Sequence, residues 1–291
     1  MVEPSSRTVV ANGIEFSVLE AGTGPLALCL HGYPDSAHTW RHLLPELAAA
    51  GYHAVAPFQR GYAPTSLAPD GCYQSGVLGL DAVALHEALG GGGDAVLIGH
   101  DWGALAAYAA ATVAPDRWRR VVAMAVPPGP VSAAGIFDYD QLKRSWYMFF
   151  QLTPLSDGVV AADGHRYIAR LWEDWSPGYD AAEDVAHFVD CVPNAAHLAA
   201  TLDYYRQTLQ FELQRPEHAA AQAAAYAVPP QPLLYLHGET DGCMGAELAA
   251  RSPECMTVPG SHFELVPGAG HFLHLEQPEV VNRLVLDFLA G

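Results

Sequence analysis

The sequence predicts an α/β protein with a mostly parallel central sheet, helices on both faces and an inserted helical domain. Short apolar runs alternate with segments of helical spacing from about residue 26 to residue 126. This alternation is absent from residues 131–225 and resumes after them. We therefore predict one core formed by residues 1–130 and 226–291, and a helical cap formed by residues 131–225.

The individual elements follow from turn chemistry and periodicity. Asn12-Gly13, between alternating residues, predicts a hairpin of two antiparallel strands within about the first 20 residues. The buried strands are expected at residues 26–30, 52–56, 95–98, 121–126, 233–236 and 264–266. Helices are expected at residues 40–48, 77–89, 104–113 and 279–289, and the first two of them stop at a glycine.

The composition excludes several classes of protein. Of 291 residues, 51% are hydrophobic and 16% are charged, which favours a large buried core. Only 14 Lys and Arg stand against 32 Asp and Glu, a net charge of -18, so neither nucleic acid nor an anionic membrane is an expected partner. No metal ion or other cofactor is expected, and a homodimer is left open.

Cysteine usage and the N-terminus suggest where the protein resides. The five cysteines are odd in number and form no CxxC pair, so neither a disulfide framework nor a zinc site is indicated. Residues 1–10 lack the apolar stretch of a signal peptide, and no later segment reads as a membrane span. We expect a cytoplasmic protein.

One pentapeptide has the form of a nucleophile elbow. Gly99-His100-Asp101-Trp102-Gly103 follows a predicted strand and precedes an alanine-rich helix, and Asp101 occupies the position usually held by serine. Glycines on either side would let this sharp turn pass close to its neighbours. Asp101 could instead cap the helix, which is a common use of aspartate.

Two later residues favour catalysis over capping. Asp241 lies just past the predicted strand 233–236, and His271 lies just past the next one. Nucleophile, acid and histidine thus occur in an order known for catalytic triads. A carboxylate nucleophile can displace a leaving group from a saturated carbon, and water then cleaves the resulting ester. In such a scheme His271 would be the general base for water, and Asp241 would orient and stabilise its imidazole.

With these motifs in place, the chain resembles the α/β-hydrolase superfamily, and specifically its epoxide hydrolase and haloalkane dehalogenase branch. The marks are His31-Gly32-Tyr33-Pro34, residues 99–103, and the run from Gly270 to Pro278. The resemblance implies an oxyanion hole formed by the backbone N–H groups of Tyr33 and Trp102. It also implies an epoxide hydrolase that opens a small apolar epoxide to a vicinal diol with water.

The same resemblance implies two cap tyrosines that act as the acid for the epoxide oxygen. Tyr147 stands seven residues before Pro154, and Tyr205 stands immediately before an arginine. Residues 151–154 depart from the family pattern, so the register could slip by one residue and align Trp146 instead. Cap aromatics can also be simple packing residues. The residues expected to bind substrate are Trp102, Trp146 and Phe150.

Other functions stay open at this point. A haloalkane dehalogenase would use the same triad, although Tyr33 stands where many dehalogenases carry a halide-binding Asn. An esterase or lactonase is disfavoured by aspartate at the position of the nucleophile. A ligand-binding protein without catalysis is also compatible with the fold, because a fold alone does not establish a function.

Overall fold

The structure, a computed structural model, describes residues 4–291. Residues 1–3, part of the predicted core, lie outside this range. The described chain contains an eight-stranded sheet of order β1-β2-β4-β3-β5-β6-β7-β8. The strands are β1 (Ser5–Ala11), β2 (Ile14–Ala21), β3 (Leu26–Leu30), β4 (His53–Pro57), β5 (Ala95–His100), β6 (Trp118–Met124), β7 (Leu233–Gly238) and β8 (His262–Val266).

Strand β1 pairs antiparallel with β2, and β2 pairs antiparallel with β4, whereas all pairs from β4 to β8 are parallel. Every residue of β3, β5 and β7 is buried, as expected of parallel strands covered on both faces. The predicted hairpin is present, with Asn12 and Gly13 both at positive φ. The predicted fold class is therefore confirmed.

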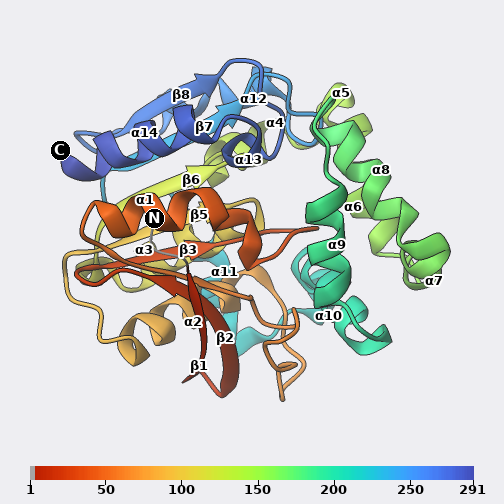
Figure 1. The fold of residues 1–291 in the computed structure, drawn as a ribbon. Coiled ribbons are helices and arrows are strands. Elements are labelled where there is room, and N and C mark those ends of the chain that lie inside the picture. The colour runs from red at the N-terminus through yellow and green to blue at the C-terminus, as the bar shows by residue number, and fades with distance from the viewer. Residues whose placement is uncertain (1–3) are drawn as a thin grey trace.

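The α-helices are α1 (Leu43–Ala49), α2 (Ser75–Ala88), α3 (Trp102–Val113), α4 (Gly129–Gly135), α5 (Tyr139–Arg144), α6 (Trp146–Gln151), α7 (Leu155–Ala161), α8 (Arg166–Trp175), α9 (Ala182–Cys191), α10 (Ala195–Leu209), α11 (Ala219–Ala224), α12 (Ala246–Ala249), α13 (Leu273–Glu276) and α14 (Pro278–Ala290). Helix α1 packs on α14, while α2, α3 and α11 form a second group (Figure 1). Almost all of α3 is buried, which explains its small alanine side chains.

Two predicted boundaries differ from the observed ones for backbone reasons. The helix expected at residues 40–48 begins as a 3-10 helix (Ala37–His42) and becomes α-helical at Leu43. Pro45 lies in the first turn of α1, where its missing N–H costs no hydrogen bond, whereas an α-helix that began at residue 40 would need that N–H to bond four residues back. Strand β6 ends at Met124 rather than residue 126, because Ala125 takes a φ of 67° and turns the chain.

Between β6 and β7, the described residues form helices and loops only. Helices α5 to α10 lie beyond the carboxyl ends of the parallel strands, coloured green to teal in Figure 1. Helix α11 falls within the range predicted for the cap, yet it packs against the core helices α2 and α3. The division into core and cap at residue 225 stays a prediction.

A buried ion pair joins the loop after β4 to the rest of the molecule. Arg60 donates two hydrogen bonds to Asp81 of α2, at 2.5 and 2.6 Å, and a third to the carbonyl of Cys72. Asn12 of the hairpin also donates to Asp81, and Tyr204 of α10 donates to the Arg60 carbonyl. Both charged side chains are almost fully buried. One pair thus connects the hairpin, α2 and α10.

We expect Arg60→Ala to lower the free energy of unfolding by about 3–5 kcal/mol, because it leaves the buried Asp81 carboxylate without its cation. The exposed pair of Arg7 and Glu20 offers a matched control. Arg7→Ala is expected to cost at most about 1 kcal/mol. Urea unfolding of both variants measures the difference, and equal losses would contradict the role given to Arg60.

Among residues 4–291, no helix is both long enough and apolar enough to cross a membrane.

Candidate active site

Asp101 lies at the sharp turn between β5 and α3. Its backbone has φ 53° and ψ −117°, a left-handed conformation that is strained for a residue with a side chain. A Cβ on Gly99 would overlap the backbone of Gly103, and one on Gly103 would overlap the carbonyl of Leu30. The turn therefore requires both glycines. The Asp101 side chain makes no capping hydrogen bond to α3, which contradicts the capping interpretation.

The sheet topology places this turn where ligands commonly bind. Within the sheet, β3 lies between β4 and β5. The chain first passes from β3 to its neighbour on one side, β4, and later enters its neighbour on the other side, β5. Such a reversal leaves a crevice at the carboxyl ends of the two central strands. Asp101 follows β5, and the segment from His31 to Tyr33 follows β3. Asp101 accepts a 2.8 Å hydrogen bond from the backbone N–H of Tyr33.

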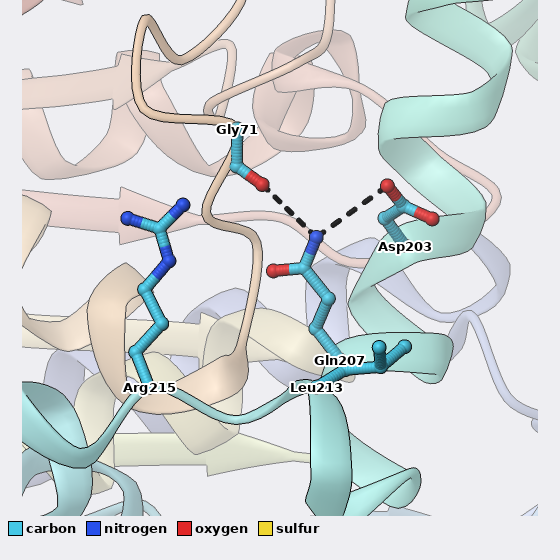
Figure 2. Close-up of a pocket in the computed structure, with 5 residues that line it drawn as sticks. All are labelled: Gly71, Asp203, Gln207, Leu213 and Arg215. Atoms are coloured by element: carbon cyan, nitrogen blue, oxygen red, sulfur yellow. Dashed lines mark hydrogen bonds between the residues drawn. The ribbon is translucent and has the colours of Figure 1, made fainter.

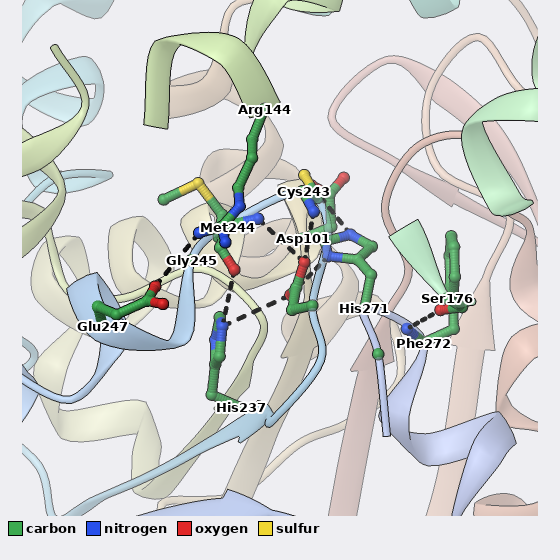
Figure 3. Close-up of polar contacts among 12 residues, drawn as sticks. Asp101, Arg144, Ser176, His237, Cys243, Met244, Gly245, Glu247, His271 and Phe272 are labelled. Atoms are coloured by element: carbon green, nitrogen blue, oxygen red, sulfur yellow. Dashed lines mark hydrogen bonds and ion pairs between the residues drawn. The ribbon is translucent and has the colours of Figure 1, made fainter. Parts of the chain in front are cut away.

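His271 lies between the two predicted acidic residues (Figure 3 shows its ring beside Asp101). Its Nδ1 is 3.0 Å from Oδ2 of Asp241, and its Nε2 is 3.8 Å from Oδ2 of Asp101. The other oxygen of Asp241 accepts hydrogen bonds from the backbone N–H groups of Cys243 and Met244, at 2.7 and 2.9 Å. The structure thus brings the three residues together in the order expected of nucleophile, histidine and acid.

Burial and mutual contact set the ionisation of these groups. Burial opposes the charged form of Asp241, but the charge and hydrogen bond of His271 outweigh it and lower the pKa of Asp241. Burial also disfavours a charged His271, yet Asp241 raises its pKa well above the usual value. Burial raises the pKa of Asp101, and His271 with the N–H groups of Tyr33 and Trp102 offsets part of this rise. Asp241 and His271 therefore form a stable ion pair.

Two tyrosines from the helical insertion lie close enough to Asp101 for its charge to act on both phenols. The Tyr147 and Tyr205 rings are nearly perpendicular, with centroids 5.8 Å apart, and both residues are almost fully buried. The Tyr205 ring lies 4.8 Å from that of Trp102, directly after Asp101. Burial raises the pKa of both phenols well above 10, and the Asp101 charge adds to this rise. Both hydroxyls therefore stay protonated at neutral pH.

Comparison with known proteins identifies the family. A model described as the alpha/beta hydrolase family matches residues 27–284. Epoxide hydrolase A of Mycobacterium tuberculosis is 30% identical, and the match covers 100% of this chain and 99% of that protein. The chain belongs to the alpha/beta hydrolase family.

Further relatives of this α/β hydrolase carry similar names. An epoxide hydrolase of Caballeronia sordidicola is 32% identical, over 97% of this chain and 92% of that protein. The crystal structure of epoxide hydrolase A from Mycobacterium thermoresistibile is 28% identical, with a TM-score of 0.81 and coverage of 99% and 98% of the two chains. The resemblance noted in the sequence is confirmed by these matches.

The predicted substrate-binding aromatics occupy different environments. Trp102 is buried beside Tyr205. Trp146 is 46% exposed and packs with Phe150 and Tyr167, at ring distances of 6.2 and 6.0 Å. Of the two neighbours, Tyr147 is therefore the buried one, which favours it over Trp146, and the register considered from the sequence stays a prediction. A role for Trp146 and Phe150 in substrate binding stays a prediction.

Two residues near Asp101, Asp241 and His271 were not singled out from the sequence. Trp175 of α8 lies 4.6 Å from the Tyr147 ring and 5.1 Å from that of His271, and its carbonyl accepts from the His271 N–H. Cys243 lies 3.2 Å from the Tyr147 hydroxyl. Its place two residues after Asp241 is the signal that could have indicated it. Trp175 had no comparable signal, because only the fold brings α8 to His271.

A polar cluster behind His271 was also missed. A carboxylate oxygen of Asp35 and one ring nitrogen each of His100 and His274 lie within 4.8 Å of one another. All three residues are buried. Burial raises the pKa of Asp35 to about 8. His100 also contacts the His271 carbonyl through its Nε2, at 2.9 Å. Asp35 directly follows the His31–Pro34 motif, and this position is a signal that the sequence did contain.

An open pocket of about 300 Å³ lies apart from these residues, beside α10 (Figure 2). It is lined by Gly71, Asp203, Gln207, Leu213 and Arg215. Gln207 donates to the Gly71 carbonyl and to Asp203. Because these polar groups already pair with one another, the pocket gives no sign of a ligand.

Proposed function

We propose that this α/β hydrolase opens epoxides to vicinal diols in two steps, with Asp101 as nucleophile. The observation that carries the proposal is a pair of buried tyrosines close enough to the buried Asp101 for its charge to raise the pKa of both phenols. An alkoxide is a strong base, so its departure requires a proton or hydrogen-bond donor, whereas a halide does not. Tyr147 and Tyr205 supply such donors, and Asp101 attacks the epoxide carbon from the opposite side.

In the second step, water cleaves the ester on Asp101. Esterification removes the negative charge that lies 3.8 Å from Nε2 of His271. Loss of this charge lowers the pKa of His271, and its Nε2 proton passes through solvent to the tyrosinate that the first step left behind, so Nε2 becomes a base for water. Asp241 stabilises the imidazolium that forms. The N–H groups of Tyr33 and Trp102 hold the oxyanion of the ester intermediate, which releases the diol and restores Asp101.

The surroundings support a small or medium apolar epoxide. Trp102 and Trp175 are buried aromatic neighbours of the two tyrosines, and apolar walls with few polar groups are typical of small-molecule sites. Helices α5 to α10 form the cap in this proposal. A cytoplasmic location fits the five free cysteines, four of them buried.

The deciding experiment offers the purified protein styrene-type epoxides and bromoalkanes in parallel. We expect diol from the epoxides and no bromide from the bromoalkanes. Bromide release without diol formation would favour the dehalogenase alternative. Ligand binding with neither product would favour a protein that only binds.

We expect Tyr147→Phe or Tyr205→Phe alone to reduce diol formation by about 10²-fold, and the double variant to be nearly inactive, because each hydroxyl shares the charge of the leaving oxygen. Tyr204→Phe is the matched control. Tyr204 is equally buried, but its hydroxyl donates to the Arg60 carbonyl. Steady-state rates of the four variants measure the effect, and a double variant as fast as the parent would exclude both tyrosines as donors.

A further inference from the structure

The two donor tyrosines belong to separate helices, and strong hydrogen bonds of their own do not fix their hydroxyls. The hydroxyl of Tyr205, on α10, makes no hydrogen bond within residues 4–291. The hydroxyl of Tyr147, on α6, contacts the Cys243 sulfur at 3.2 Å, and a thiol is a weak hydrogen-bond partner. The position of each hydroxyl therefore depends on how α6 and α10 are held relative to each other.

Helix α6 cannot set its own position. It has six residues, and so short a helix is unstable without tertiary contacts. Its buried residues are Tyr147 and Gln151, which are four positions apart and so share one face. The Gln151 side chain donates a 2.9 Å hydrogen bond to the Tyr33 hydroxyl, which anchors this face to the core. A single hydrogen bond acts as a pivot, so a second anchor is required to fix the Tyr147 ring.

Arg206 supplies the second anchor from α10. It directly follows Tyr205, and its Nε donates to the Gln151 carbonyl at 3.0 Å. Gln151 is the last residue of α6, where carbonyls lack a partner within the helix and a cation is favourable. Nη2 of Arg206 donates to Ser156 at 2.9 Å and to Asp157 at 2.6 Å, both on α7. Arg206 thus joins α10 to α6 and α7, which also pack on α10 and on each other (Figure 1).

We propose that Arg206 is a positioning residue for ring opening, which fixes the separation of the Tyr147 and Tyr205 hydroxyls around the epoxide oxygen. It acts through the two helices and not on the reacting atoms. A planar guanidinium suits this task, because its fixed fork of donors binds a carbonyl, a hydroxyl and a carboxylate at once. Displacing a catalytic group by about 1 Å can cost about 10²-fold in rate. This role rests on the proposed function, because it concerns the donors of that reaction.

The effect of Arg206 should fall on the first chemical step alone. The tyrosines act when Asp101 opens the ring, whereas His271 and the backbone N–H groups of the core act on the ester. Those N–H groups belong to the loop after β3 and to the start of α3. The hydrogen bonds of Arg206 within residues 4–291 go to neither segment. A residue that only supported the fold would affect both steps.

The rate of ester formation on Asp101 tests the proposal, measured by intact mass in the His271→Gln background, where the ester accumulates. We expect Arg206→Gln to slow ester formation at least about 10-fold. With His271 intact, the fraction of protein present as ester under saturating epoxide should fall, because formation slows and breakdown does not. In a Tyr205→Phe background, Arg206→Gln should slow ester formation far less, since one donor remains and no pair has to be aligned.

Arg170→Gln is the matched control, because Arg170 is another arginine of the helical insertion, exposed on α8 and paired with Glu173 at 2.5 Å. It should form the ester at the parent rate. Arg206→Met, which keeps an unbranched stem for packing, takes the place of Arg206→Gln should thermal melting show that the glutamine variant is unfolded. A folded Arg206 variant that forms the ester at the parent rate, or that slows turnover without lowering the ester fraction, would overturn the proposal. A parent protein that forms no diol would instead contradict the proposed function.

Discussion

Replacing Asp101 by alanine is expected to reduce epoxide turnover by more than about 10³-fold, because no other carboxylate can form the ester. Asp241 is fully engaged by His271 and two backbone N–H groups. Water could still reach a bound epoxide in this variant, but no step would proceed through a covalent intermediate. Steady-state diol formation measures the loss.

Exposed Asp94, in the loop before β5, serves as the control for this substitution. Asp94→Ala should keep the parent rate. Circular dichroism and urea unfolding establish that the Asp101 variant is folded. A folded Asp101→Ala protein with more than about 1% of the parent rate would rule out Asp101 as the nucleophile, since loss of a triad nucleophile costs several orders of magnitude.

The second large effect is expected for His271→Gln, which should stop turnover while leaving the first step intact. Glutamine cannot accept a proton from water, so the ester on Asp101 would accumulate. Intact-mass measurement after incubation with a styrene-type epoxide should show one added substrate mass, and peptide mapping should place it on Asp101. Multiple turnover is expected to fall by more than about 10³-fold.

Two controls separate this mechanism from others. His262 is exposed on β8, so His262→Gln should show no adduct and normal turnover. The double variant of His271→Gln with Asp101→Ala should show no adduct either. Absence of the adduct in a folded His271→Gln protein that still binds substrate would contradict the two-step mechanism.

Many elements of the fold, and the turn around Asp101, could be predicted from the sequence because they depend on interactions between neighbouring residues. The Asn12-Gly13 turn, the buried apolar strands and the helical periodicities depend on neighbouring residues, so each could be inferred without the fold. The elbow around Asp101 was equally readable, because its two glycines serve a turn of five residues. The positions of Asp241 and His271 followed from their places at the ends of predicted strands, since parallel strands present their carboxyl ends at one edge.

The tertiary structure decided which side chains share the site. Tyr147 and Trp146 are adjacent on a helix, about 100° apart around its axis, and only packing against α8 and α10 turns Tyr147 inward and leaves Trp146 half exposed. Helix α11 packs on α2 and α3 although its residues fall within the range predicted for the cap. Cys243 reaches Tyr147 across 96 residues of chain. Such contacts arise from the approach of whole elements, which no local pattern encodes.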